Sequence, residues 1–261
     1  MSTALTFTNP KVQRLRRLVG RRSARLEEGA FVVEGPVLVA AAAAAGWEIE
    51  AVFVANGAWS YQPPDGVPVF ELGPGVVEKV ASTDTPQSAL AVVRRRTATL
   101  DALASATFVV VGDRIADPGN AGTLLRSAEA AGADVVVLSS GSVDVFNPKV
   151  VRASAGALFH VPIVTDVSLD EVVRATPCRI VGTSSHRGVP YTDVDLTVPT
   201  AVVLGNEAHG LPDDDPVEDW VTIPHAGRAE SLNVAMAATV LAFEVARQRR
   251  AAANPLAGGP G

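Results

Sequence analysis

Three glycine-containing segments in the second half of the chain combine residue types that could do chemistry. They span residues 113–128, 202–212 and 223–235. Their polar candidates are Asn120, Arg126, Glu207, Ser231 and Asn233. An arginine can bind a phosphate or stabilise a developing alkoxide, and amide or carboxylate groups can orient a substrate through hydrogen bonds. Glycine lets the backbone approach a ligand closely, so these residue types together suit a ligand site.

Each segment also has an ordinary structural explanation. Asn120 and Ser231 could be helix N-caps, and Arg126 could be a solvated side chain. The glycines around Glu207 could form a turn before a helix. Because polar turns between strands and helices are common, no single segment assigns a function.

The three segments occupy the same place in the predicted secondary structure, since each follows an apolar strand and leads toward a helix. Apolar runs predict strands at residues 108–111, 134–138, 161–164, 179–183, 201–204 and 220–223. Periodicity and end signals predict helices at residues 120–131, 148–158, 169–175 and 231–250. The alternation of strands and helices predicts an α/β fold.

The first half of the chain predicts a smaller α/β domain. Strands are expected at residues 31–35, 49–54, 67–71 and 90–93, and helices at residues 10–28, 36–45 and 76–81. The predicted organisation is therefore a small domain at residues 1–96, a linker at 97–106, a larger domain at 107–253 and a Pro/Gly-rich tail at 254–261.

Charge is distributed unevenly between these two parts. The net charge is -6, but residues 1–96 have a balance of +2 and the remainder one of -8. No acidic residue interrupts the stretch 11–25, which contains Arg14, Arg16, Arg17, Arg21, Arg22 and Arg25. Clustered cations suit phosphate contacts with RNA, although they also suit a solubilising helix face, a membrane or an acidic protein.

Several function classes lose support from the sequence. Neither the glycine fingerprint of dinucleotide-binding folds nor a P-loop is found. Cys178 is the single cysteine and the four histidines lack ligand spacing, so neither a disulfide framework nor a metal site is expected. No apolar run is long enough to span a membrane and no signal-peptide pattern is found, so a cytoplasmic location is the simplest expectation.

The three polar segments resemble, in content and order, the motifs of the SpoU/TrmH methyltransferases of the SPOUT superfamily. The matching patterns are N-x-G-x-x-x-R at 120–126, L-G-N-E-x-x-G-L at 204–211, and I-P with S-L-N-V-A between 223 and 235. Residues 31–35 and 85–91 are similar to the substrate-binding domain of rRNA-type members, which has a fold like that of ribosomal protein L30e. One departure is Ala235, where many members have a serine.

The resemblance implies a trefoil-knot methyltransferase domain preceded by a small L30e-like domain. It implies S-adenosylmethionine (SAM) as cofactor, held by Thr183, Ser184, Leu204, Gly205, Asn206, Gly210, Ile223 and Leu232. It also implies a homodimer in which the last helix contributes Val234, Val240, Leu241, Phe243 and Val245. No metal and no membrane are implied.

The implied reaction is methylation of a ribose 2'-hydroxyl in structured RNA. Asn120, Arg126, Glu207, Ser231 and Asn233 would form the catalytic site, with Arg126 gripping a phosphate because a guanidinium is a poor base. The N-terminal domain favours rRNA, in particular 23S rRNA, as substrate. The alternatives are a tRNA ribose methyltransferase, a non-catalytic RNA-binding protein of the same fold and, less well supported, a nucleotide-dependent oxidoreductase.

Overall fold

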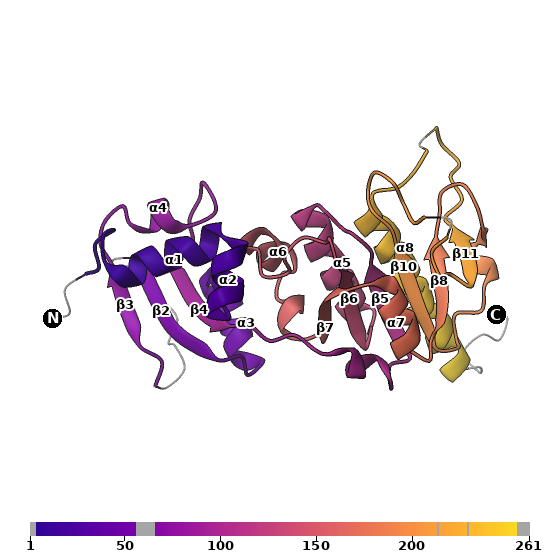
Figure 1. Ribbon diagram of the computed structural model, residues 1–261, viewed down its shortest axis with the longest axis horizontal. Coiled ribbons are helices and arrows are strands. Elements are labelled where there is room, and N and C mark those ends of the chain that lie inside the picture. Colours follow the sequence, from indigo (N-terminus) through magenta and orange to yellow (C-terminus); the bar gives the residue numbers. More distant parts are fainter. Residues whose placement is uncertain (1–3, 56–65, 213, 229, 255–261) are drawn as a thin grey trace, which may run out of the picture. The chain divides into compact units, whose positions relative to one another are not determined.

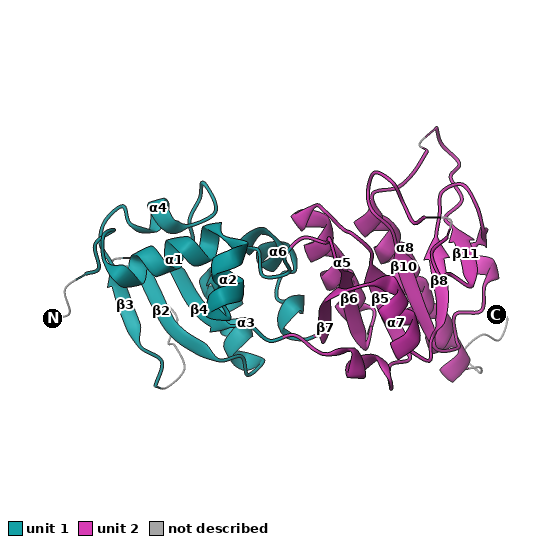
Figure 2. Ribbon diagram, in the orientation of Figure 1, with its two compact units in different colours: residues 1–96, 144–160 teal, residues 97–143, 161–261 magenta. Residues whose placement is uncertain are grey.

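A computed structural model describes residues 4–55, 66–212, 214–228 and 230–254 of the 261-residue chain. These residues form two compact units (Figure 2). The first unit contains residues 1–96 and 144–160, and the second contains residues 97–143 and 161–261. Residues 144–160 therefore group with the first unit, although they lie within the sequence range predicted for the second domain.

The first unit is built on a four-stranded sheet with the order β1-β4-β2-β3 (Figure 1). Its strands are β1 (Ala30–Glu34), β2 (Ile49–Ala55), β3 (Val69–Leu72) and β4 (Ala89–Arg94). Strand β4 is antiparallel to both β1 and β2, whereas β2 and β3 are parallel. Its helices are α1 (Pro10–Gly20), α2 (Arg22–Glu28), α3 (Pro36–Ala44), α4 (Val77–Val80) and α6 (Pro148–Ala153).

The predicted helix at residues 10–28 is divided into α1 and α2. Arg21 separates them with an extended backbone, at φ -129° and ψ 119°. The apolar face of α1 is buried, since Val12, Leu15 and Leu18 lie in the core of the unit. The arginine-rich segment is thus a bent pair of helices packed on a sheet rather than one continuous rod.

Residues 144–160 join the first unit through aromatic and ionic contacts. The rings of Phe31 and Phe146 have centroids 4.7 Å apart, and those of Trp47 and Phe159 are 5.4 Å apart. The helix predicted at 148–158 ends at Ala153. Two left-handed residues follow soon after, at positions 155 and 156, with φ 50° and 98°, and an α-helix cannot continue through them.

The second unit contains a seven-stranded sheet with the order β7-β6-β5-β10-β8-β11-β9, in which every pairing is parallel. Its strands are β5 (Phe108–Gly112), β6 (Val135–Ser139), β7 (Ile163–Val167), β8 (Arg179–Thr183), β9 (Val189–Pro190), β10 (Thr200–Leu204) and β11 (Asp219–Thr222). Its α-helices are α5 (Pro118–Ala130), α7 (Leu169–Ala175) and α8 (Val234–Ala253). Short 3-10 helices lie at Leu100–Leu103 and Tyr191–Asp193.

The neighbourhood of β5 and β10 positions the polar segments. These two strands are central in the sheet, and Leu204 is paired with Gly112 at their carboxyl ends. The loops after both strands therefore start side by side, although about ninety residues separate them in the sequence. Helices α5 and α8 pack against each other, with a 2.6 Å hydrogen bond between the hydroxyls of Ser127 and Thr239.

Candidate active site

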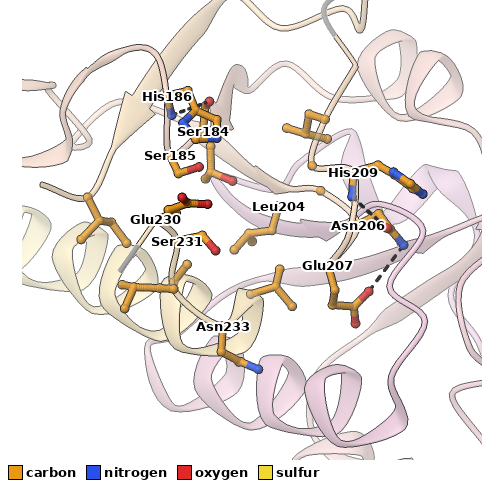
Figure 3. Close-up of a pocket in the computed structure, with 18 of the residues that line it drawn as sticks. Ser184, Ser185, His186, Leu204, Asn206, Glu207, His209, Glu230, Ser231 and Asn233 are labelled. Carbon is orange, nitrogen blue, oxygen red and sulfur yellow. Dashed lines mark hydrogen bonds between the residues drawn. The ribbon is translucent and has the colours of Figure 1, made fainter. Parts of the chain in front are cut away.

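A cavity of about 730 Å³ lies beyond the carboxyl ends of β8, β10 and β11 (Figure 3). All eight residues expected to bind a cofactor line it, and so do four of the five expected catalytic residues, all except Arg126. The structure therefore brings together three polar segments that are far apart in the sequence. Figure 3 shows Ser184 and His186 at one end of the cavity and Glu207 and Asn233 at the other.

The loop after β10 is shaped by close backbone packing. A Cβ atom on Gly205 would lie 2.3 Å from the carbonyl carbon of Gly210 and 2.4 Å from the backbone nitrogen of Leu211. Gly210 has a left-handed φ of 64° and donates its N–H to the carbonyl of Asn206 at 2.9 Å. The side-chain oxygen of Asn206 accepts from the N–H groups of residues 208 and 209. Glycine is thus required at Gly205 by space and favoured at Gly210 by conformation.

A chain of side-chain hydrogen bonds connects the three segments. The amide nitrogen of Asn120 donates to Glu207 Oε1 at 3.0 Å, and the amide oxygen of Asn120 accepts from the Asn233 nitrogen at 2.9 Å. The Asn233 oxygen in turn accepts from the backbone N–H groups of Ala235 and Met236. We call Glu207, Asn120 and Asn233 the polar relay.

Glu207 is held as a carboxylate. Partial burial alone would raise its pKa, but hydrogen bonds from the Asn120 side chain and from the backbone N–H groups of Ala116 and Asp117 outweigh burial. The net result is a pKa below the usual glutamate value. An ionised Glu207 that accepts these three hydrogen bonds, and a longer one of 3.5 Å from the Asn206 side chain, is suited to orienting Asn120 and poorly suited to removing a proton at neutral pH.

The helix ends differ in detail from the predicted ones. Helix α5 begins at Pro118, and its N-cap is Asp117, whose carboxylate accepts from the Asn120 N–H at 2.8 Å. The N-cap of α8 is Asn233, not Ser231 as predicted. Asn120 is thereby freed from capping, and its side chain is available to the polar relay.

Arg126 lies on α5, six residues and less than two turns beyond Asn120. Its side chain is exposed and does not line the cavity, and within the described residues it makes no hydrogen bond or ion pair. Its neighbour Ser127 contacts Thr239 of α8. Met236 and Phe243 lie three residues before and four after Thr239 and are 53% and 45% exposed. Met236 and Phe243 are therefore exposed apolar side chains on α8, the helix that packs against the helix of Arg126.

The arginines predicted to bind RNA differ in their exposure to solvent. Arg16, Arg17, Arg21 and Arg22 are exposed on α1, on α2 and between them. Arg14 is half-buried and ion-paired with Glu28 at 2.6 Å and Glu50 at 2.7 Å, and chiefly the hydrogen bond that it donates to Glu50 raises its pKa.

Arg25 is the exception, and the prediction that it contacts RNA is wrong. Its residue is 3% exposed, and its Nε lies 2.7 Å from Asp144 Oδ2. Its NH1 also donates to the carbonyl of Leu18 at 2.8 Å. These buried partners come from α1 and from residues 144–160, so Arg25 stabilises the first unit.

Sequence analysis missed part of the cavity wall. Ser185, His186 and Arg187, which follow β8, line the cavity, as do His209, His225 and Glu230. The sequence predicts no metal site for the histidines and gives them no other role, and among the described residues no cluster of histidine, cysteine and carboxylates could hold a metal. The signal that could have found residues 185–187 is their place directly after the predicted strand that ends at Thr183.

Comparison with known proteins decides the family. Residues 107–243 match the model of the SpoU rRNA Methylase family, and residues 9–91 match that of the MRM3-like substrate binding domain. The chain belongs to the SpoU rRNA methylase family. The α/β fold with a preceding small domain is thereby confirmed. No described helix is long and apolar enough to cross a membrane.

Two relatives match nearly the whole length of this chain. It is 33% identical to the 23S rRNA (guanosine(2553)-2'-O)-methyltransferase RlmP of Bacillus subtilis, over 91% of this chain and 96% of that protein. It is 32% identical to the 23S rRNA (uridine(2479)-2'-O)-methyltransferase of Streptomyces viridochromogenes, over 94% and 92% of the two chains.

Two solved structures with bound AdoMet (SAM) are similar in fold. The SpoU methyltransferase AviRb from Streptomyces viridochromogenes superposes with a TM-score of 0.84, at 32% identity, over 93% of this chain and all of that one. An rRNA methyltransferase from Sinorhizobium meliloti has a TM-score of 0.83 and 31% identity, over 94% and 97% of the two chains.

Proposed function

We propose that this protein transfers the methyl group of SAM to a ribose 2'-hydroxyl of 23S rRNA. The observation that carries the proposal is the polar relay at the edge of a cavity lined by every residue expected to bind the cofactor. The names of the two 23S rRNA relatives and the match of residues 9–91 to a substrate-binding domain support the choice of substrate. Such a substrate implies work in the cytoplasm.

The cavity fits SAM in size and character. Its volume of about 730 Å³ lies in the range of roughly 300–1,000 Å³ typical of small-molecule sites. Apolar Leu204, Ile223 and Leu232 suit the adenine ring, and the close-packed backbone at Gly205 and Gly210 suits hydrogen bonds to it. When bound, SAM would supply a methyl group activated by its sulfonium centre, with the neutral thioether as the leaving group.

The protein side chains orient the ribose and manage its proton. Asn120, held by Glu207 and Asn233, presents one amide orientation to the ribose, and Ser231 adds a hydroxyl beside it. Arg126 is permanently charged, so it binds the adjacent phosphate and stabilises the developing alkoxide. The 2'-hydroxyl proton passes to an oxygen of that phosphate and then to water.

A homodimer would complete this site. Arg126 does not line the cavity of its own chain, and α8, which packs against the helix of Arg126, has Met236 and Phe243 exposed, so we infer that a second subunit covers these side chains and that Arg126 serves the substrate of its partner. Of the helix residues expected at the interface, Leu241 and Val245 are 1% and 0% exposed and belong to the core of the unit itself. Phe243 remains the exposed candidate.

We also infer that the second unit is knotted. Its support is that the loops after β8, β10 and β11 all meet at one cavity, to which Ile223, His225 and residues 230–233 return after β11. A knot would hold these loops together without bound cofactor, which suits a site made largely of backbone.

Radiolabelled SAM, offered with free 23S rRNA, 50S subunits and tRNA in separate reactions, tests the proposal. Label in one mapped ribose of 23S rRNA, free or in the subunit, is the expected result. Label in tRNA would keep the reaction and overturn the substrate. SAM binding without label in any RNA would favour a non-catalytic RNA-binding protein of the same fold.

A further inference from the structure

The segment that follows β8 forms one wall of the cavity. Ser184, Ser185, His186 and Arg187 all line it, and Figure 3 shows the first three at one end of the cavity. None of them lies in a helix or strand, so the shape of this wall depends on contacts beyond regular secondary structure. A flexible wall would have to become ordered when a ligand binds, which lowers affinity.

Trp220 of β11 provides a platform for this segment. The guanidinium carbon of Arg187 lies 3.4 Å from the centroid of the Trp220 ring, as expected for a stacked cation–π pair. Trp220 itself packs against the buried core between the sheet and α7. The arginine is thus stacked on a ring that the core holds in place.

Backbone contacts fix both ends of the same segment to β11. The N–H of Ser184 donates to the carbonyl of Val221 at 3.0 Å, and Val189 pairs with Val221 in a parallel bridge. Between them, Gly188 crosses Trp220 so closely that a Cβ atom would lie 2.4 Å from the Trp220 carbonyl oxygen. Its φ of 103° also favours glycine.

We propose that Arg187 and Trp220 are positioning residues that act as a latch for the cofactor wall formed by residues 184–186. The latch presets the wall, so that SAM and other adenosine ligands bind without the cost of ordering it. This inference rests on the proposed function, because it assumes that the cavity binds an adenosine-containing cofactor. It concerns the whole wall and not a bond between Arg187 and one group of the ligand.

Two ligands and five variants of the full-length chain test the latch, one of them the double variant that combines Arg187→Met with Trp220→Leu. Isothermal titration calorimetry would measure Kd for S-adenosylhomocysteine and for 5'-methylthioadenosine, which lacks the amino-acid part. Arg187→Met keeps the aliphatic length without the charge, Arg187→Lys keeps a cation, and Trp220→Leu removes the ring. Arg174→Met changes an arginine of α7 that does not line the cavity and is the matched control.

The expected result is a loss of about 3- to 30-fold in affinity for both ligands in Arg187→Met and in Trp220→Leu. Arg187→Lys should restore part of it, and the double variant should be no weaker than either single one because both remove the same contact. In methyl transfer, KM for SAM should rise while kcat at saturating SAM stays within about twofold of the wild type.

Three results would overturn the latch. Unchanged affinities in Arg187→Met would show that the stack does not shape the wall. A loss confined to S-adenosylhomocysteine would show instead that Arg187 binds the amino-acid part directly. An equal loss in Arg174→Met would point to general destabilisation. Failure of the wild-type protein to bind either ligand is a different outcome, since it would refute the proposed cofactor itself.

Discussion

The side chains of Asn120 and Glu207 are hydrogen bonded at 3.0 Å, although 87 positions separate them in the sequence. Because the carboxylate can only accept, it fixes the Asn120 nitrogen toward itself and the Asn120 oxygen toward Asn233. The oxygen of Asn233 is then committed to the first N–H groups of α8. One ionised group therefore sets the direction of every hydrogen bond in the polar relay.

Replacing Glu207 by glutamine should disturb the relay without emptying the cavity. A glutamine amide can donate as well as accept, so Asn120 would lose its single orientation. We expect kcat to fall by about 100-fold, as for loss of one oriented active-site group, with little change in Kd for S-adenosylhomocysteine. Glu230→Gln, in the same cavity but outside the relay, is the control. Equal activity in the two variants would remove the relay from the mechanism.

The lowered pKa of Glu207 predicts that the stability of the protein depends on pH. The pKa of Glu207 is lowered in the folded protein, from its ordinary value of 4.5, so the unfolded chain binds the proton more readily. The contribution of Glu207 is therefore fully present above about pH 4.5 and is lost as pH falls through the folded pKa. The difference in unfolding temperature between the wild type and Glu207→Gln should be constant near pH 7 and should disappear in acid. A difference in unfolding temperature that grows in acid would contradict a lowered pKa of Glu207 in the folded protein.

The sequence predicts which residues form the site better than it predicts the contacts between them. Apolar runs locate the strand ends, and the motifs at those ends contain most of the residues that line the cavity, although not residues 183–187. The contact of Asn120 with Glu207 depends on the adjacency of β5 and β10, which hydrophobic periodicity does not reveal. The prediction that Arg25 contacts RNA fails for the same reason. Its partner Asp144 is 119 positions away, and the spacing of charges in the sequence cannot show a distant acid. Residues 144–160 likewise have α/β periodicity but belong to the first unit through aromatic contacts.

Arg126→Ala tests the one catalytic candidate outside the cavity. We expect methyl transfer to be lost, by at least about 1,000-fold, while the affinity for S-adenosylhomocysteine stays near that of the wild type. Arg126→Lys should recover little activity, because an ammonium cannot reproduce the bidentate guanidinium contact with a phosphate. Activity in Arg126→Ala close to the wild type would refute the role of Arg126.

Replacing the buried arginine of the first unit should lower stability, whereas replacing its exposed arginines should weaken RNA binding. Arg25→Ala leaves the buried Asp144 carboxylate unpaired, so we expect the free energy of unfolding to fall by about 3–5 kcal/mol. Joint replacement of Arg16, Arg17 and Arg21 by glutamine should leave unfolding nearly unchanged. It should instead weaken RNA binding and reduce the slope of log affinity against log salt. An unchanged salt slope in filter binding would make these exposed arginines a solubilising surface only.

Gly205→Ala tests whether the loop after β10 packs on itself as closely as the structure shows. The added methyl group would lie within 2.6 Å of three backbone atoms of residues 210 and 211, and backbone atoms cannot turn aside as a side chain can. Overpacking of this kind costs about 1–3 kcal/mol, and here the strain falls on the loop that borders the cofactor. We expect a lower unfolding temperature and loss of measurable binding of S-adenosylhomocysteine. Gly227→Ala is the matched control, because nothing lies within 4 Å of its new methyl group. Normal binding by Gly205→Ala would mean that residues 205 and 210 can separate without loss of the cofactor site.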